Sequence, residues 1–277
     1  MRIDIETSQH HVEWPDLVER VRLAEDAGFE GVWLFDHFKP LYGDPKGPCL
    51  EAWTLLAALA AVTKRVRLGA LVTGVTYRHP SILAAEAITV DHVSNGRLDF
   101  GIGAAWFEGE HNELGIDFPD TKERVEKLRD AVAIYKTLTT EEDASYEGHH
   151  YSLRNATYLP HPVQRPHPPI WIGASGEKVM LPFAGRVADA WHTFGRREDL
   201  KRKSDIVTRA AEAAGRDPST IMRSTNISIS KPFDEVRERA AAYRDIGFST
   251  LIVSWPSEGV ERVHAFVEEV LPELQAL

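Results

Sequence analysis

The chain has 277 residues, of which 43% are hydrophobic and 27% charged, enough for one large globular domain or two small ones. Its formal net charge is −10, and a surface of that sign disfavours binding to nucleic acid or anionic lipid. Cys49 is the only cysteine, which excludes internal disulfides and a Cys-x-x-Cys metal site and fits a reducing cytoplasm. We expect no secretory signal, and no apolar run approaches the ~20 residues of a membrane span.

Short apolar runs rich in valine and isoleucine alternate along the chain with longer segments of helical periodicity. The predicted strands are 2–6, 31–35, 66–72, 98–102, 169–173, 187–191, 223–229 and 249–254. Eight such units without a break in composition predict an α/β fold, a single (β/α)8 TIM-barrel domain over residues 1–277. A doubly wound sheet is the rival architecture, but it usually has a glycine fingerprint after its first strand, where this chain reads TSQHHVEWP.

The segments between the strands carry helix start and stop signals. Pro80 stands at the beginning of one predicted helix, and Asn95, followed by a glycine, ends it. Asp120 can cap a later helix, with Glu123 three residues further on as in a capping box. The last helical segment is predicted within residues 257–274.

The chain between the fourth and fifth predicted strands is longer than one strand–helix unit needs. Residues 139–168 contain several prolines and show no helical face. Loops of this length inside a compact domain are usually functional. We interpret the segment as an insertion after strand 4 that forms a small hairpin or a lid.

The loops that follow the strands of a barrel form its catalytic face. Asp36 and His37 stand in the loop after the second predicted strand, where the apolar run 32–35 stops abruptly. Trp106 and Phe107 follow the fourth strand, and a flat apolar ring system would fit a pocket with such walls. Three other aromatic residues near strand ends are better interpreted as core packing: Trp33, Trp171 and Trp191.

The stretch GASGEK at 173–178 opens a predicted helix with small residues, and Thr193 and Arg196 follow the next strand. Backbone N–H groups at a helix start, joined by a hydroxyl group and an arginine, are typical of a phosphate site. The alternative interpretation is an ordinary glycine-rich turn.

Metal and paired-carboxylate chemistry find little support in the residue spacing. His10 and His11 are adjacent, so their side chains would point in different directions from an extended chain, and we expect no metal. Glu108 and Glu110 lie in a predicted loop without a visible partner. A solvated acidic turn is therefore favoured over a glycosidase-like carboxylate pair.

Three stretches of the sequence resemble one known family in the same order along the chain. They are DHF at 36–38, LGALVTGVTYRHPSILAAEAITVDHVSNGRLDFGIGAAWFEGEHNELGIDFP at 68–119 and PHPPIWIGASGEK at 166–178. The chain resembles the luciferase-like monooxygenase superfamily of flavin and deazaflavin barrels, and within it the coenzyme F420-dependent oxidoreductases. The resemblance covers nearly the whole chain.

The resemblance implies roles for individual positions. Asp36 would bind the cofactor, and His37 would be the catalytic residue near the hydride-accepting carbon. A non-proline cis peptide bond that supports the ring would fall near Leu71 and Val72, with Thr73 following it. The phosphate-binding positions would be Gly173, Ala174, Ser175, Gly176, Thr193 and Arg196.

The chain departs from the sugar-phosphate dehydrogenases of this family at two places. Leu41 stands where they carry a tryptophan, and Ala104-Ala105-Trp106 replaces a stretch that contains a catalytic glutamate. We therefore expect a small apolar or aromatic carbonyl, alkene or imine compound as the substrate. Its pocket would be formed by His10, Leu41, Trp106 and Phe107.

The resemblance implies hydride transfer between coenzyme F420 and this substrate, with His37 donating or accepting the accompanying proton. Two alternatives stay open: an FMN-dependent monooxygenase that uses O2, and a non-catalytic flavin-binding protein. Members of the family often dimerise through helices 2 to 4, so we expect a homodimer. The alanine-rich segment 55–62 would allow close helix contact, although it can equally pack on the barrel.

Overall fold

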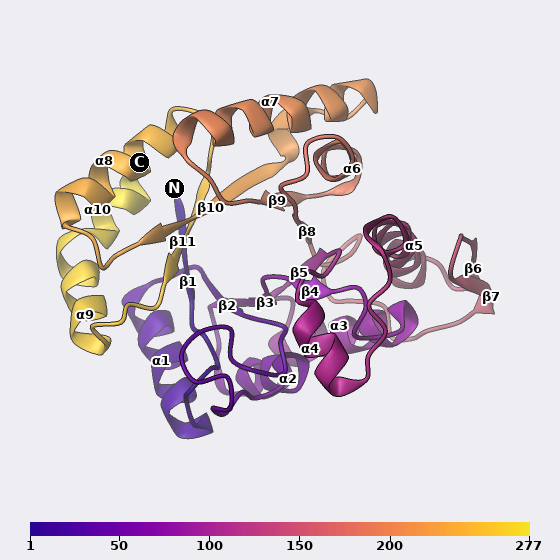
Figure 1. The fold of residues 1–277 in the computed structure, drawn as a ribbon, viewed down its shortest axis with the longest axis horizontal. Coiled ribbons are helices and arrows are strands. Elements are labelled where there is room, and N and C mark those ends of the chain that lie inside the picture. The colour runs from indigo at the N-terminus through magenta and orange to yellow at the C-terminus, as the bar shows by residue number, and fades with distance from the viewer.

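The computed structural model describes all residues 1–277 and contains a closed ring of eight parallel strands surrounded by helices (Figure 1). The ring consists of β1 (Arg2–Glu6), β2 (Gly31–Leu34), β3 (Arg67–Ala70), β5 (Leu98–Gly103), β8 (Ile170–Gly173), β9 (Ala190–His192), β10 (Met222–Ser228) and β11 (Thr250–Ser254). Pairing of β3 with β5 and of β1 with β11 completes the closure. The predicted (β/α)8 TIM barrel is therefore confirmed, because alternating strand and helix patterns allow few other architectures.

The third predicted strand is interrupted. β3 ends at Ala70, and the two-residue strand β4 (Thr73–Gly74) pairs with β5 outside the ring. The peptide bond between Leu71 and Val72, which separates the two strands, is cis. The cis bond expected near these two residues is confirmed.

Large side chains fill the inside of the barrel. The rings of Trp33 on β2 and Trp171 on β8 meet edge to face, with centroids 4.6 Å apart. These strands are not neighbours in the ring, so the two side chains meet across its interior. A Cβ atom on Gly69 of β3 would lie 2.4 Å from the Trp33 ring, so the glycine makes room for the indole. Trp191 lies in the larger core cluster instead, and all three tryptophans are buried, as expected.

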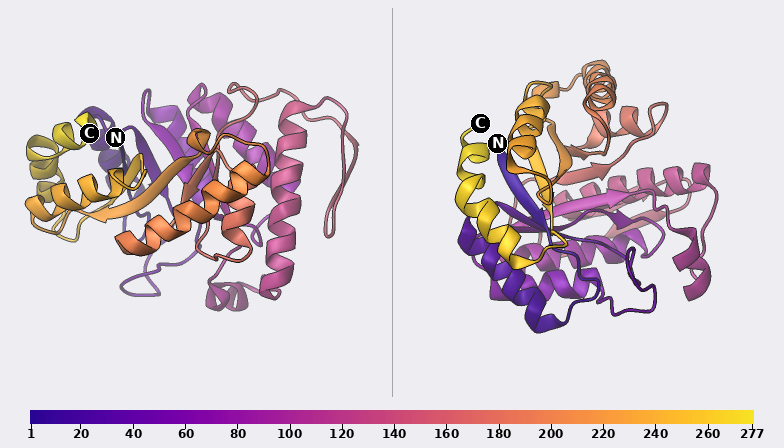
Figure 2. Two further views of the ribbon diagram at one scale, coloured as in Figure 1. Left: turned by 90° about the horizontal axis from the view of Figure 1, so that it is seen from above. Right: turned by 60° about the vertical axis from the view of Figure 1, so that its left-hand side comes forward.

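Helices cover the outside of the ring (Figure 2). They are α1 (Trp14–Ala27), α2 (Ala52–Val62), α3 (Pro80–Ser94), α4 (Glu108–Leu114), α5 (Thr121–Thr140), α6 (Met180–Val187), α7 (Arg197–Ala213), α8 (Phe233–Arg244), α9 (Val260–Glu269) and α10 (Leu271–Ala276), with the 3₁₀ turn η1 (Pro218–Thr220). Their apolar faces and the outer faces of the strands form one cluster of 58 buried residues. None of the helices combines the length and hydrophobicity that crossing a bilayer requires.

The helix limits follow the local signals with one exception. Asp120 caps α5 by accepting a 2.8 Å hydrogen bond from the N–H of Glu123, and Asn95 ends α3 in the left-handed conformation. The prediction of one helical segment over 257–274 is wrong. Pro272 lacks an N–H group, and the segment breaks at Val270 into α9 and α10.

The insertion after the fourth ring strand is a hairpin of β6 (Ala144–Glu147) and β7 (Ser152–Ala156) beside α5 (Figures 1 and 2). Asp130 of α5 holds the hairpin, since its carboxylate accepts hydrogen bonds from the Tyr146 hydroxyl at 2.8 Å and the His150 N–H at 2.7 Å. No residue of 139–168 lines the cavity described below, so the hairpin does not act as its lid.

Candidate active site

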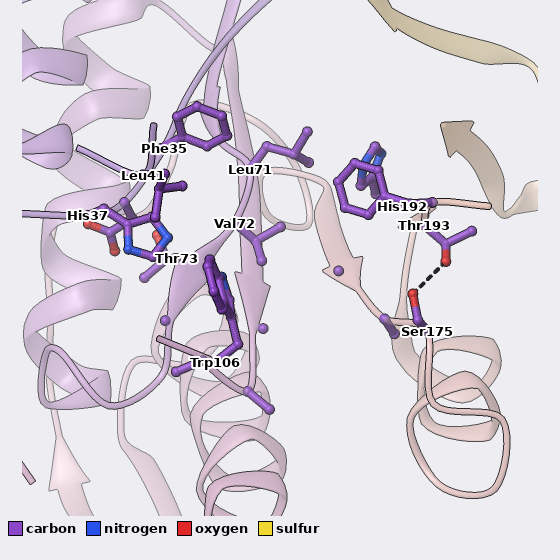
Figure 3. A pocket seen from close by; sticks show the side chains of 18 of the residues that line it. Phe35, His37, Leu41, Leu71, Val72, Thr73, Trp106, Ser175, His192 and Thr193 are labelled. Atoms are coloured by element: carbon purple, nitrogen blue, oxygen red, sulfur yellow. Dashed lines mark hydrogen bonds between the residues drawn. The ribbon is translucent and has the colours of Figure 1, made fainter. Parts of the chain in front are cut away.

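A cavity of about 380 Å³ opens at the carboxyl ends of the ring strands (Figure 3). Loops after β2, β5, β8 and β9 supply most of its lining. His37 and Trp106 stand on one side of it, which we call the first wall. Ser175, His192 and Thr193 stand on the opposite side, the second wall. This is the end of the barrel at which catalytic groups collect in enzymes with this fold.

Leu71 and Val72 form the back of the cavity between the two walls (Figure 3). Val72 packs against two glycines: a Cβ atom on Gly103 or Gly173 would lie 2.8 Å from Val72 Cγ2. Any larger residue at either position would displace the valine. The back of the cavity is therefore apolar and closely packed.

The segment after β2 has no regular structure, and side chains from other loops hold its backbone. Gln9 accepts a 3.1 Å hydrogen bond from the N–H of Phe35 and donates one to the carbonyl of the same residue. The N–H of Leu41 donates to His10 Nδ1 at 3.2 Å. Burial lowers the pKa of His10 to about 4, which keeps this acceptor unprotonated. Tertiary contacts thus fix the strand-2 loop.

Glu110 of α4 is fully buried and joins this loop to the first wall. One carboxylate oxygen, Oε1, accepts hydrogen bonds from the N–H groups of Phe38 and Lys39 at 2.7 and 3.0 Å. The other, Oε2, lies 3.0 Å from His37 Nδ1. Burial by itself would raise the pKa of Glu110, but the hydrogen bonds from His37, Tyr77 and the backbone lower it below the ordinary value.

The ionised Glu110 determines which nitrogen of His37 carries a proton. A carboxylate can only accept, so His37 Nδ1–H is the donor, and neutral His37 has its free lone pair on Nε2. Nε2 has no hydrogen-bond partner in the protein, and His37 lines the cavity. The first wall therefore presents an oriented imidazole with one nitrogen available to a bound molecule.

Tyr77 completes this arrangement. Its hydroxyl donates to Glu110 Oε2 and lies 3.4 Å from His37 Nδ1. Burial and the Glu110 carboxylate raise the pKa of Tyr77, so the phenol stays protonated and remains a donor. The Tyr77 ring stacks on the buried His111 with centroids 4.7 Å apart, which fixes its position.

Asp36 lies beside His37, but its carboxylate is already paired. Arg78 donates to both oxygens, at 2.7 and 3.1 Å, and also contacts Glu51 and Glu86. Asp36 lines the cavity while this two-point ion pair anchors it. The alternating side-chain directions after β2 thus give Asp36 and His37 different partners.

The second wall is uncharged. Ser175 Oγ and Thr193 Oγ1 lie 2.9 Å apart, so one hydroxyl donates to the other and one hydrogen remains free for a ligand. The N–H groups of Ser175 and Gly176 have no acceptor in the protein. The sequence predicted that residues 173–178 open the helix, but α6 begins only at Met180. These two N–H groups therefore belong to a turn that precedes the helix.

His192 ends β9 on the same wall and is 3% exposed. Its Nδ1 lies 2.9 Å from Ser224 Oγ on β10, whereas Nε2 is buried without a partner. Burial lowers the pKa of His192 to about 3, so the ring is neutral. Nothing in the local sequence predicts a role for this residue.

The structure brings most of the predicted site residues together. Those that line the cavity are Asp36, His37, Leu41, Leu71, Val72, Thr73, Trp106, Gly173, Ala174, Ser175 and Thr193. Four do not line it. His10 supports Leu41, Phe107 stacks behind Trp106, Gly176 follows Ser175, and Arg196 is an exposed N-cap residue 3.6 Å from Asp199.

The interpretation of Glu110 as part of a solvated acidic turn is wrong, because the residue is buried in α4 and bonded to the first wall. The buried residues of this seven-residue helix are Glu110 and His111. A helix that buries polar side chains lacks the apolar periodicity by which helices are recognised in sequences. Tyr77 was missed because its partners come from distant parts of the chain.

The cavity fits a flat ring that carries a polar, phosphate-bearing chain. The apolar back formed by Leu71 and Val72 can support a ring, and the free hydroxyl and N–H groups near Ser175 can receive a phosphate. The buried, unpartnered nitrogen of His192 offers a further polar contact between them.

Comparison with known proteins agrees with this geometry. A family model described as luciferase-like monooxygenase matches residues 1–269. An F420-dependent glucose-6-phosphate dehydrogenase of Kineococcus radiotolerans is 36% identical over 217 residues, which are 76% of this chain and 62% of that protein. The matched region thus spans less than two thirds of this relative.

Two solved structures have a similar fold. An F420-dependent secondary alcohol dehydrogenase in complex with an F420–acetone adduct has a TM-score of 0.89 and 19% identity, and the match covers 99% of this chain and 98% of that one. A monooxygenase from Streptomyces bottropensis has a TM-score of 0.78 and 25% identity, with 99% of both chains covered. From the match over nearly all its length, the chain belongs to the luciferase-like monooxygenase family.

Proposed function

We propose that the protein is an F420-dependent oxidoreductase that transfers a hydride between this coenzyme and a small apolar or aromatic organic substrate. The observation that carries the proposal is His37, held at Nδ1 by Glu110 and free at Nε2 at the edge of a ring-sized cavity. The names of its relatives support the choice of coenzyme.

Each part of the cavity has a proposed task in binding the coenzyme. The ring would be supported by Leu71, Val72 and Thr73. Asp36, anchored by Arg78, would hold the loop after β2 against the ring. Gly173, Ala174, Ser175 and Thr193 would receive the phosphate, with Gly176 contributing its free N–H group. When bound, the coenzyme supplies a deazaflavin ring that takes up or gives a hydride.

His37 would move the proton that accompanies the hydride. Imidazole is the side chain best suited to proton transfer near neutral pH, and Glu110 holds Nδ1–H so that Nε2 is the nitrogen that exchanges the proton. A carboxylate that orients a histidine is a common arrangement for a general base. Glu110 would be a positioning residue rather than a group that touches the substrate.

The rim of the cavity supports an apolar substrate. Trp106 is 65% exposed at the mouth, with Tyr42 and Phe194 also exposed around it. None of the 21 lining residues is a lysine or an arginine. A sugar phosphate would lack a cation to bind its charge once the coenzyme occupied the free hydroxyl and N–H groups. We propose a carbonyl, alkene or imine compound with an apolar or aromatic body.

Titration of the purified protein with F420 and with FMN tests the coenzyme. We expect F420 to bind with a micromolar Kd and FMN to bind more weakly. Quenching of fluorescence during the titration measures both affinities. A panel of small ketones, alcohols, enones and imines, with glucose 6-phosphate as the comparator, then tests the substrate class by the absorbance of the coenzyme. Tight FMN binding without F420 binding would overturn the proposal.

An FMN-dependent monooxygenase is the second candidate, because the 25% identical Streptomyces protein of the same fold is a monooxygenase. Oxygen uptake with reduced FMN and the same panel of compounds separates the two activities. The oriented His37–Glu110 pair argues against a non-catalytic flavin-binding protein, since binding alone needs no such arrangement.

We also propose that the protein is a homodimer that associates through α2 and α3. Ile82 and Val93 of α3 and Val62 of α2 are 57%, 45% and 37% exposed, and a second copy of the chain that packed on these helices would cover them. Light scattering after size-exclusion chromatography should give twice the mass of the 31.1 kDa chain. An Ile82→Lys variant should elute as a monomer.

A further inference from the structure

We propose that His192 is a binding residue for the polar chain of the flavin-type ligand, and that its Nε2 makes a hydrogen bond to a hydroxyl group of that chain. The inference rests on the proposed function, since it assumes a ring-and-chain ligand in this cavity. It assigns a partner to a buried polar atom that has none in the protein.

The position of His192 matches such a contact. The ring lines the cavity on the second wall, above the hydroxyl pair of Ser175 and Thr193 and facing Leu71 at the back (Figure 3). A molecule that lies with its ring against Leu71 and Val72 and its phosphate near Ser175 must pass this residue. The chain between ring and phosphate is the part that His192 would contact.

Nε2 of His192 has no hydrogen-bond partner in the protein, and the ring of Phe194 packs edge to face on the imidazole with centroids 4.8 Å apart. Nδ1 is engaged by Ser224 Oγ at 2.9 Å, and the side chain is almost fully buried. A buried polar atom without a partner is costly, and native proteins rarely keep one without a functional reason. A ligand that supplies the missing hydrogen bond regains that cost on binding.

A hydroxyl group suits His192 better than a phosphate does. The ring is neutral, and the Ser224 hydroxyl can donate to Nδ1 or accept from it. Nε2 is therefore a donor in one tautomer and an acceptor in the other. A hydroxyl group can pair with either form, whereas a phosphate dianion can only accept.

Two substitutions distinguish the contribution of Nε2 to ligand binding from that of Nδ1. His192→Asn places an amide where Nδ1 was, near Ser224, and removes the group at the position of Nε2. His192→Gln extends an amide to the position of Nε2. We expect the asparagine variant to raise the Kd for F420 about tenfold and the glutamine variant to stay within about threefold of wild type.

The ¹⁵N chemical shift of His192 Nε2 provides a readout that does not depend on turnover. Adding F420 to the wild-type protein should shift this resonance and leave that of the solvent-exposed His264 unchanged. Unchanged affinity in both variants, or equal losses in both, would overturn the proposal. Equal losses would mean that the packing of His192, and not its Nε2, supports binding.

The same experiment distinguishes failure of this inference from failure of the proposed function. Should the wild-type protein bind FMN and not F420, the proposed coenzyme is wrong, and the comparison of the two variants is made with FMN. FMN also joins its ring to a phosphate through a hydroxylated chain. A tenfold difference between the variants would then support the role of His192, and equal affinities would refute it.

Discussion

Both walls of the cavity contain a buried histidine, but the two rings have opposite surroundings. On the first wall, His37 faces the ionised Glu110, whose two oxygens are bonded to His37, Tyr77 and two backbone N–H groups. On the second wall, the only hydrogen-bond partner of His192 is the Ser224 hydroxyl, the Phe194 ring packs edge to face on the imidazole, and Nε2 is buried without a hydrogen bond.

This difference indicates a division of labour. A carboxylate beside an imidazole stabilises a positive charge, so the first wall suits a histidine that gains and loses a proton. The second wall excludes charge on His192 and leaves hydroxyl, N–H and imidazole groups open, so it suits recognition of a ligand's polar chain. The four predictions below test this division, beginning with the largest expected effect.

Removing the imidazole of the first wall should stop turnover without preventing binding. His37→Ala is expected to lower kcat by about 10²–10⁴-fold, because it removes the proposed proton donor or acceptor. The Kd for F420 should change by less than about threefold. Both are measured with the best substrate of the panel, and His150→Ala on the hairpin is the control. Normal turnover by the coenzyme-bound variant would refute the proposed division.

Neutralising the carboxylate behind His37 should have the next largest effect. Glu110→Gln can keep an oxygen acceptor for the N–H of Phe38, but the amide nitrogen that then replaces Oε2 accepts from neither His37 nor Tyr77. We expect kcat/KM to fall about 10–100-fold, the value of a hydrogen bond to a charged group. The pH profile of kcat should shift as well, which a purely structural role would not produce.

Glu113→Gln is the matched control for this substitution. Glu113 lies on the same helix but forms a surface contact with Lys39, and its side chain is 62% exposed. Its replacement should leave the rate and the pH profile unchanged. A Glu110→Gln variant that behaves in the same way would show that the first wall needs no carboxylate.

The histidine of the second wall should make folding sensitive to acid. Its pKa is about 3 in the folded protein and near 6.5 in the unfolded chain, so below pH 6.5 only the unfolded chain takes up the proton. Stability is lost as the pH falls. His192→Gln has no group that titrates at this position. Between pH 7 and pH 5, the unfolding free energy of the wild-type protein should therefore fall by about 2 kcal/mol more than that of the variant.

Urea unfolding at pH 7, 6 and 5 measures this effect. His264→Gln on the surface of α9 is the control and should follow the wild-type curve. Parallel curves for wild type and His192→Gln would show that the second wall tolerates a charged imidazole. The contrast between the two walls would then be lost.

The smallest expected effect is at the hydroxyl pair. Thr193→Val keeps the shape of the side chain and removes the hydroxyl bonded to Ser175. We expect the Kd for F420 to rise about five- to tenfold with kcat unchanged, the cost of one neutral hydrogen bond. Thr140→Val, at the exposed end of α5, is the control. A drop in kcat at saturating coenzyme would mean that the second wall takes part in chemistry.

The sequence was most informative where a signal is local. The alternation of short strand-like runs and helical segments predicted all eight ring strands. The signal is clearest in β2 and β11, where burial on both faces leaves a nearly continuous apolar run, whereas β1 and β10 also contain polar residues. The apolar run 32–35 of the second strand ends before Asp36, and this end placed His37 at the mouth of the barrel. Arg196 does not line the cavity, since its position after a strand says nothing about the direction of a long, flexible side chain.

The barrel and the position of His37 along the chain were thus determined by the sequence itself, since hydrophobic periodicity and strand ends are properties of neighbouring residues. The environment of each histidine was decided only by the tertiary structure. Glu110 reaches His37 from 73 residues away, and Ser224 reaches His192 from 32 residues away. Such contacts arise when the ring closes and its loops meet at one end, and no local pattern records them.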